Sequence, residues 1–593
     1  GNCEQLEEFY VSGPSFQRDD KFIFPCQTFL DDVTSPNLQR YVIELGPLQT
    51  YGHGINENSS VRALSLKEFD ISKFGASKVN LLQRSEDIYL NRLHGGCKNI
   101  APELVQAAGS MNDLTKLRLR ACSEIECIID TTCARSYFQL VALIPGLVKL
   151  ELEEMENLKE LCHGSPMHAV SFFEKLEELY IRKCEELHNI FPANCELRSL
   201  RILKIDGRGL YQPTVAISCA AVMLFSMSAA KSLEQLEELS IADCKDLRCI
   251  ISDEDDKGNA DISQALSNSQ SLLPNLKKLY IHYCPKLEFV LPRFCVGLEK
   301  LQEIDIFKAS ELRYVFGHEY QNEIQTKLPN LESLKLQNLA NLVRICSGNS
   351  QPLWPSLREI RCVNCPKLNT SCINLMVRST MKLQHLSKGN SLEDDQGKKL
   401  ASKLEQVEFR GFSELRFIWC DPTNRQILSL QYLQYLKVDG CAKLKSIFSV
   451  AILRSLQELT SLVIQGCNEL EEIISENEEL HHDMSNTTKA VCFSKLRNLT
   501  VKNCNKLKSI LSVSMLGIPP QLSYLHISDA AELVQVFRNT SEKIVFPNLR
   551  EMKLNKLPCL VEICKGFELL QPMKATKIII DQCPNITSIS KAT

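Results

Sequence analysis

The sequence predicts an α/β solenoid, in which short strands stack side by side into one parallel sheet. Two observations support this fold class. A fifteen-residue phrase recurs along the chain, and in each copy two apolar residues lie two positions apart, which is the spacing of a strand with one buried face. One copy also holds too little apolar surface to offset the entropy lost on folding, so the copies must stack on one another.

The phrase is clearest in the unit that begins at Leu276. Its apolar positions are Leu276, Leu279, Ile281, Cys284, Leu287 and Val290. We find sixteen such units, with first residues at Leu114, Leu147, Leu176, Leu200, Leu236, Leu276, Leu301, Leu331, Leu357, Leu404, Leu433, Leu459, Leu496, Leu522, Leu549 and Ala575. This spacing matches the leucine-rich repeat, whose units each add one strand to a shared sheet.

The predicted architecture is therefore a leucine-rich repeat horseshoe with the parallel sheet on its concave face. The spacing between unit starts varies, which predicts irregular loops and short helices on the convex face. Residues 1–100 are expected to hold degenerate repeats, with strands near Leu64 and Ile88, continuous with an array of about sixteen units over residues 101–593. The chain is interpreted as a fragment of a receptor or as a truncated gene product. Insertions at 252–271, 369–402 and 475–489 are expected to be exposed loops.

The 26 cysteines point to a reducing compartment rather than to a disulfide framework. Nine of them share one position, eight residues after the first residue of their unit: Cys122, Cys184, Cys244, Cys284, Cys365, Cys441, Cys467, Cys504 and Cys583. A small, weakly polar side chain suits the bend that ends the strand, so these residues should be reduced core thiols. We therefore expect a cytoplasmic protein.

Composition gives no sign of nucleic acid or of a bilayer. The net charge is -4, and no basic run with interleaved aromatic residues occurs. The longest apolar stretch, residues 216–230, is interrupted by serines and is too short to span a membrane. It is expected to form a helix packed on the convex side.

No motif supports catalysis, so the sequence predicts a protein that is not an enzyme and needs no cofactor or metal. It contains no GxxxxGK[ST] phosphate loop, no GxSxG elbow and no HExxH pair. Cys362 and Cys365 form a CxxC, but the repeat register places both in the core and no second CxxC completes a zinc site. The trio His481-His482-Asp483 stands alone in an acidic insertion, which makes it a weak metal candidate.

The exposed face of the sheet is the candidate binding surface. It is formed by the fourth and sixth residues after the first leucine of each unit. Aromatic and arginine side chains on a rigid surface are enriched at the sites that carry most binding energy. The candidate protein-binding residues are Arg118, Arg120, Tyr180, Arg182, Tyr280, His282, Lys335, Arg361, Arg410 and Lys437.

Three sequence features together resemble one family. Units open with a phrase such as Phe546-Pro547-Asn548-Leu549, they continue as LEELSIADCKDLRCII at 236–251, and acidic insertions follow a double isoleucine. The segment LLQRSEDIYL at 81–90 is similar to a family segment that precedes the regular array. The chain resembles the C-terminal leucine-rich repeats of plant intracellular immune receptors of the coiled-coil, nucleotide-binding class, the disease resistance proteins.

The resemblance implies a recognition and autoinhibition module in the plant defence response. Such repeats sense a pathogen effector or a guarded host protein, and they hold the receptor's nucleotide-binding domain inactive. That domain is absent from this chain, so nucleotide switching is not assigned to it. The expected partners are a protein on the concave face and the nucleotide-binding domain of the same receptor.

Two other functions stay open from the sequence. The repeats suit the substrate-recruiting adaptor of a ubiquitin ligase, although no F-box segment precedes the array. They also suit an extracellular receptor ectodomain, for which N-glycosylation sequons speak, although no signal peptide or regular 24-residue unit supports it. The sequons lie at Asn58, Asn369, Asn486, Asn498, Asn539 and Asn585.

Overall fold

The structure is a computed structural model of all 593 residues. The residues that it describes are 10–12, 41–45, 62–71, 81–108, 111–132, 144–164, 173–187, 190, 197–207, 223–225, 227–251, 272–291, 298–316, 328–346, 354–368, 381–383, 400–419, 428–453, 455–475, 493–512, 519–538, 546–563 and 577–586.

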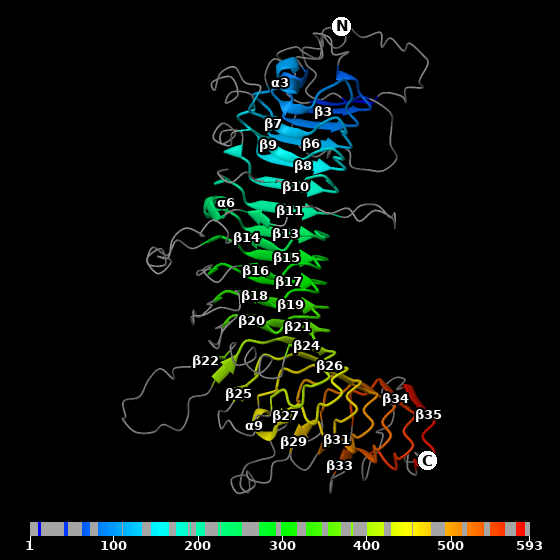
Figure 1. Ribbon diagram of the computed structural model, residues 1–593. Coiled ribbons are helices and arrows are strands. Elements are labelled where there is room, and N and C mark those ends of the chain that lie inside the picture. The colour runs from blue at the N-terminus through cyan, green and yellow to red at the C-terminus, as the bar shows by residue number, and fades with distance from the viewer. Residues whose placement is uncertain are drawn as a thin grey trace, which may run out of the picture. The chain divides into compact units, whose positions relative to one another are not determined.

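Contacts divide the chain into two compact units, Gly1–Leu298 and Glu299–Thr593. This division differs from the boundary near residue 100 that the sequence suggested, and that boundary stays a prediction. Both units are built in the same way, from parallel strands that follow one another in chain order (Figure 1). Each unit is an α/β leucine-rich repeat solenoid, as predicted.

In the first unit, each strand of the large sheet pairs in parallel with the next in chain order. The strands are β1 (Tyr10–Ser12), β2 (Tyr41–Leu45), β3 (Arg62–Lys67), β4 (Asp87–Asn91), β6 (Lys116–Arg120), β8 (Lys149–Glu153), β10 (Glu178–Arg182), β11 (Ile202–Asp206), β13 (Glu238–Ala242) and β15 (Lys278–His282).

The second unit repeats this arrangement. Its strands are β17 (Glu303–Phe307), β19 (Ser333–Gln337), β21 (Glu359–Val363), β24 (Gln406–Arg410), β26 (Tyr435–Asp439), β28 (Ser461–Gln465), β30 (Asn498–Lys502), β32 (Tyr524–Ser528), β34 (Glu551–Asn555) and β35 (Lys577–Asp581).

The repeat phrase predicted these strands correctly. All sixteen predicted units supply one of them, and each strand begins two residues after the first residue of its unit. In fifteen of the sixteen predicted units the second and fourth residues of the strand are buried, as Leu279 and Ile281 of β15 show, and the first, third and fifth point outward; β35 is the exception. We call the outward side the strand face. Strands β3 and β4 confirm the repeats predicted near Leu64 and Ile88, whereas β2 was not predicted.

Short strands and single-turn helices form the opposite side of each unit. In the first unit these are β5 (Asn99–Ala101), α3 (Glu103–Ala108), β7 (Cys127–Asp130), β9 (Glu160–His163), β12 (Met223–Phe225), α6 (Met227–Ser232), β14 (Cys249–Ile251) and β16 (Phe289–Leu291). In the second unit they are β18 (Tyr314–Phe316), β20 (Arg344–Cys346), β22 (Met381–Leu383), β23 (Leu400–Ser402), β25 (Leu428–Ser429), β27 (Phe448–Ser449), α9 (Val450–Leu453), β29 (Ile474–Ser475), β31 (Ser509–Ser512) and β33 (Gln535–Arg538).

Two expectations about this side need correction. The insertion at 369–402 is not wholly a loop, because β22 and β23 form an antiparallel pair within it. The apolar stretch 216–230 was expected to be a helix, but its described part contains strand β12 before α6 begins at Met227. Among the described residues, no helix combines the length and the apolarity needed to cross a bilayer.

In most repeats the residue directly after the strand adopts the left-handed backbone conformation, with positive φ. Ala121, Asp243, Asn338 and Gly440 directly follow their strands and have φ between 49° and 65°. This conformation reverses the chain and aims its N–H at the next unit: Ala121 N donates to Glu153 O at 2.9 Å, and Asp243 N donates to His282 O at 2.8 Å. The turns therefore extend the hydrogen bonding of the sheet beyond the last residue of each strand.

The nine cysteines that lie eight residues after the first residue of their repeats all make the same hydrogen bond, which explains why this position accepts a thiol. In each of these nine repeats the cysteine Sγ donates to the carbonyl of the last strand residue, two positions earlier, as Cys122 does to Arg120 O at 3.4 Å. Cys122 also donates to Leu90 O of the preceding unit, at 3.6 Å. Eight of the nine are buried and Cys583 is half-buried, and no disulfide joins cysteines within the described residues. The prediction of core thiols is confirmed for these eight.

Alkaline pH is expected to destabilise the fold through these thiols. Burial raises the pKa of Cys122 to about 11 and that of Cys365 to about 12, so the folded chain keeps protons that the unfolded chain loses above its ordinary value near 9. Between those values stability falls as pH rises, by about 1.4 kcal/mol per pH unit for each thiol. Urea unfolding at pH 8 and pH 10 measures the slope. Cys365→Ala should make the slope shallower, and an unchanged slope would contradict this explanation.

Candidate functional site

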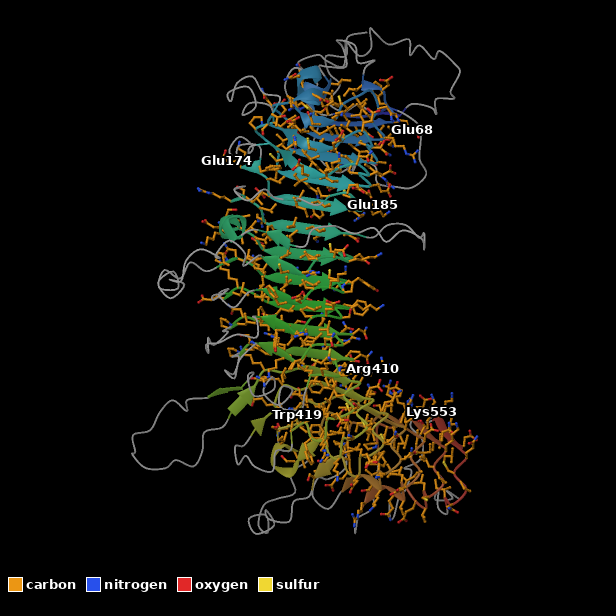
Figure 2. All side chains as sticks on the ribbon, viewed as in Figure 1. Glu68, Glu174, Glu185, Arg410, Trp419 and Lys553 are labelled. Atoms are coloured by element: carbon orange, nitrogen blue, oxygen red, sulfur yellow. The ribbon has the colours of Figure 1, made fainter. Side chains whose placement is uncertain are left out.

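The ten candidate residues all lie on strands of the large sheets. Arg118 and Arg120 are on β6, Tyr180 and Arg182 on β10, Tyr280 and His282 on β15, Lys335 on β19, Arg361 on β21, Arg410 on β24 and Lys437 on β26. Each is the third or fifth residue of its strand and therefore belongs to the strand face. Figure 2 shows the side chains of this face, with Arg410 and Lys553 labelled.

Arg118 differs from the expectation of an exposed binding residue. Its guanidinium Nη2 lies 3.1 Å from Asp87 Oδ1, and its Cζ lies 5.2 Å from the centre of the Tyr89 ring. Arg118 is 8% exposed and Asp87 is 6% exposed. A buried charge with a buried partner is a structural element, so Arg118 is not available to bind another protein.

Arg120 and Arg182 share one carboxylate. Strand β8 lies between their strands and places Glu153 opposite both of them. Glu153 is 3.8 Å from the guanidinium of Arg120 and 3.4 Å from that of Arg182. Burial disfavours the charge on Arg120, yet Glu153 and Glu154 outweigh it and raise the pKa of the group. The side chain of Arg182 remains half-exposed.

Tyr180 lies between two lysines. Lys149 Nζ is 4.4 Å and Lys204 Nζ is 5.9 Å from the centre of its ring, a geometry in which the ring face attracts the ammonium groups. Lys149 also contacts Glu178 at 3.0 Å. Burial raises the pKa of the Tyr180 hydroxyl, which stays a neutral donor to Glu178. The tyrosine is therefore preorganised, with part of its surface open to a partner.

Tyr280 and His282 occupy the last described strand of the first unit's sheet. Both are partly exposed. Their neighbours on β13 are the small residues Ser240 and Ala242. The large ring of Tyr280 protrudes beside the small side chains of Ser240 and Ala242. A partner with a complementary shape can recognise such an uneven surface.

The four candidates of the second unit also pair with acids. Lys335 lies between Glu303 at 3.2 Å and Glu359 at 3.4 Å. Burial opposes the charge on Lys335, but these two carboxylates raise its pKa. Arg361 and Lys437 share Glu408, at 3.0 Å and 3.1 Å, and Arg410 contacts Asp439 at 3.2 Å.

Most charges on the strand face are therefore neutralised by neighbours. The strand register places Lys335 of β19 beside Arg361 of β21, and Arg410 of β24 beside Asp439 of β26. Exposed ion pairs of this kind contribute about 0.2 to 1 kcal/mol each. Their main effect is to present a surface with fixed, alternating charge rather than a field of one sign.

Sequence reasoning missed the first residue of each strand, which also faces outward. Lys149 and Glu178 occupy this position, as do Tyr435 and Tyr524 in the second unit. The signal was present, because the alternation that buries the second and fourth residues places the first on the same side as the third. The cross-strand acids Glu153 and Glu408 were also overlooked as charge partners of the candidates.

A metal or redox site receives no support from the described residues. Cys362 is buried, and burial raises its pKa well above the ordinary value, so it is a poor thiolate. No cluster of three or more histidine, cysteine, aspartate or glutamate residues in the described part of the chain is arranged to hold a metal. The trio His481-His482-Asp483 lies outside the described residues.

Two of the sequon asparagines, Asn498 and Asn585, lie among the described residues. Asn585 uses its side-chain amide to donate to Pro558 O at 2.7 Å. Asn498 is the first residue of β30. The asparagines after proline in the unit openings act similarly, since Asn275, Asn330 and Asn548 each donate to a carbonyl of the preceding unit.

Comparison with known families identifies the repeats. The family of plant disease resistance protein RPS2-like leucine-rich repeats matches residues 83–207, 214–325, 270–391, 374–468 and 469–593. The chain belongs to this family. The resemblance drawn from the sequence motifs is thereby confirmed, and the repeats are those of a plant resistance protein.

Two relatives from Arabidopsis thaliana are similar to parts of the chain. The probable disease resistance protein At1g61300 is 24% identical over 306 residues, which cover 49% of this chain and 34% of the relative. The disease resistance protein At4g27190 is 31% identical over 157 residues, covering 26% and 15%. The chain thus corresponds to about a third or less of the length of these two family members.

Two solved structures match the chain at low sequence identity and low TM-score. A leucine-rich repeat protein from Leptospira interrogans, LIC12759, is 15% identical with a TM-score of 0.37, covering 78% of this chain and 95% of that one. The plant peptide hormone receptor RGFR1 in complex with RGF2 is 10% identical with a TM-score of 0.21, covering 96% and 94%.

Proposed function

We propose that this chain is the protein-recognition module of a plant intracellular immune receptor. It is non-catalytic, works in the cytoplasm, and binds a pathogen effector or a guarded host protein on its strand face. It also docks on the nucleotide-binding domain of its receptor and holds that domain inactive. The family match over residues 83–593 carries this proposal.

The geometry of the strand face supports a binding role. Backbone hydrogen bonds between neighbouring strands fix its backbone, and cross-strand contacts such as Lys335–Glu303 hold many of its side chains, so a partner has less to order on binding. Tyr180 is held by two lysines and a glutamate. Buried thiols that donate to strand carbonyls suit a reducing compartment, because a disulfide would remove those donors.

Reversing the charge of Arg182 and Arg361 together tests the proposal. In the complete receptor that contains this chain, Arg182→Glu with Arg361→Glu should abolish the response to the pathogen or raise basal activity. Both side chains are about half-exposed and each ion pair contributes only about 0.2 to 1 kcal/mol, so the fold should survive. Cell death in leaf tissue, with and without the pathogen, is the measurement.

Lys443→Glu is the matched control. Lys443 is half-exposed and paired with Glu414 at 2.7 Å, but it lies in a turn rather than on the strand face. This variant should respond normally. A double variant that accumulates to normal levels with unchanged response and unchanged basal activity would contradict the proposed function.

A further inference from the structure

Two exposed cations, one on the strand face and one directly before its strand, lack acidic partners. Across most of the face each cation contacts a carboxylate, as Lys335 and Arg410 do. Arg497 immediately precedes β30 and Lys502 ends it, and both are exposed. Among the described residues, neither forms an ion pair. The chain as a whole has a net charge of -4, so the positive charge of these two residues is a local excess.

The neighbouring strands offer these two cations no carboxylate. Arg497 donates its backbone N–H to Thr460 O, and its carbonyl accepts from Ser523 N, so its lateral neighbours are Thr460 and Ser523. Lys502 is paired in register with Gln465 on β28 and with Ser528 on β32. All four neighbours are uncharged. Arg201, at the equivalent position in the first unit, instead contacts acids on both sides.

Between the two cations the strand face is neutral. Ser461 and Val463 of β28 lie beside Asn498 and Thr500 of β30. Tyr524 of β32, 38% exposed, adjoins Asn498 and is one of the few large apolar side chains that the described chain leaves exposed. We name these residues of β28 and β30, together with Tyr524, the neutral strip. His526 of β32, whose Nε2 lies 3.2 Å from Glu551, borders the strip beside Thr500 and is not part of it. A partner can cover it without desolvating an ion pair, which removes a cost that the rest of the face imposes.

We propose that the neutral strip binds an extended protein segment with an uncharged centre and a carboxylate near each end. Arg497 and Lys502 meet the two carboxylates, while Tyr524, Asn498 and Thr500 contact the centre. Five residue-to-residue steps of about 3.3 Å separate the two cations, so the carboxylates lie roughly 16 Å apart. This inference rests on the proposed function and specifies the chemistry of the partner.

The arrangement favours a protein segment over nucleic acid. Nucleic-acid grooves carry a continuous track of cations and several aromatic rings for stacking bases. The neutral strip has one cation at each end and one well-exposed ring, Tyr524. Beyond the Lys502 end lies an open hollow of about 410 Å³, lined by Asn505, Asp529, Ala531, Lys556, Pro558 and Gln582, whose acidic and basic groups balance. It offers no further track for phosphates.

Selection from a random peptide library tests the proposal directly. The intact 593-residue chain, immobilised, selects from phage-displayed twelve-residue random peptides. Enriched peptides should carry Asp or Glu on both sides of an uncharged, aromatic or aliphatic centre. A synthetic copy of one enriched peptide should bind about tenfold or more weakly to the Arg497→Glu, Lys502→Glu double variant, and its affinity should fall as salt is added.

Lys508→Glu is the control variant. Lys508 is exposed and belongs to the same repeat, but it precedes β31 on the opposite side of the unit. Its binding should equal that of the unaltered chain. Failure to enrich acidic-flanked peptides, equal binding by the double variant, or tight binding of a thirty-residue deoxythymidine oligonucleotide would each overturn the proposal. The selection needs no receptor activity, so its failure is distinct from failure of the leaf assay.

Discussion

Asp87→Ala is expected to lower the local stability of the first unit by about 3 to 5 kcal/mol, the usual cost of leaving one partner of a buried ion pair alone. The substitution strands the guanidinium of Arg118, which is 8% exposed and has Asp87 as its bidentate acceptor. Lys116, which contacts Asp87 at 3.4 Å, loses the same partner. Hydrogen exchange of peptides covering residues 62–120 measures the change, because repeats unfold locally.

Arg118→Met provides the comparison for this site. It leaves Asp87 with Lys116 and replaces the guanidinium by a chain that still covers Tyr89, so it should cost clearly less than Asp87→Ala. Equal exchange in Asp87→Ala and the unaltered chain would contradict the structural role of the pair. The same variants separate stability from recognition, because a buried Arg118 contributes to the fold and not directly to binding.

Phe448→Ala is expected to destabilise the second unit by about 3 to 5 kcal/mol, as removal of a buried aromatic ring does. Phe448 is 0% exposed and stacks on Trp419, with ring centres 5.5 Å apart and planes at 7°. Phe493 adjoins its other side at 6.3 Å. Three successive parts of the solenoid therefore share this ring, and its loss leaves a cavity that they cannot easily fill.

Tryptophan fluorescence in urea is the natural measurement for Phe448→Ala. The chain has two tryptophans, and Trp354 and Trp419 both belong to the second unit, so the signal reports on that unit alone. Tyr432→Ala, in which the removed ring is 48% exposed, should shift the transition far less. If the two variants shift it equally, the aromatic stack does not stabilise the fold in the way described.

The strands of the large sheets were predictable because their chemistry is local. Each strand needs two inward aliphatic residues two positions apart and a small residue at the bend, as in Leu279, Ile281 and Cys284, and the sequence states these directly. Strand β2 was not predicted, although Leu38, Tyr41 and Ile43 keep the first three spacings of the phrase. The later apolar positions are lost there, because Gly46, Gln49 and Gly52 occupy them. The antiparallel pair of β22 and β23 was not predicted, because a long insertion separates its two short strands in the sequence.

The strand face was predictable in position but not in chemistry. Alternation placed Arg118 and Arg361 on the outward side correctly. Whether an outward cation is exposed, paired or buried depends on the residue at the same position of the next strand, and loops of variable length separate the two in the sequence. Arg118 is buried with Asp87 as its partner on the neighbouring strand. Lys502 is exposed, and its neighbours on the adjoining strands are the uncharged residues Gln465 and Ser528.

Glu153 can contact both Arg120 and Arg182 only because its repeat lies between theirs, so the pairing of charges depends on the order of the repeats. Unequal crossing-over readily deletes one coil from a tandem array, and loss of the coil containing β8 would set Arg120 directly opposite Arg182. Like charges facing each other across a ladder oppose pairing. The cost is about 0.2 to 1 kcal/mol for each such pair. Loss of a coil between uncharged coils avoids this cost, whereas elsewhere neighbouring carboxylates must offset it, as Glu303 and Glu408 do where Lys335 faces Arg361.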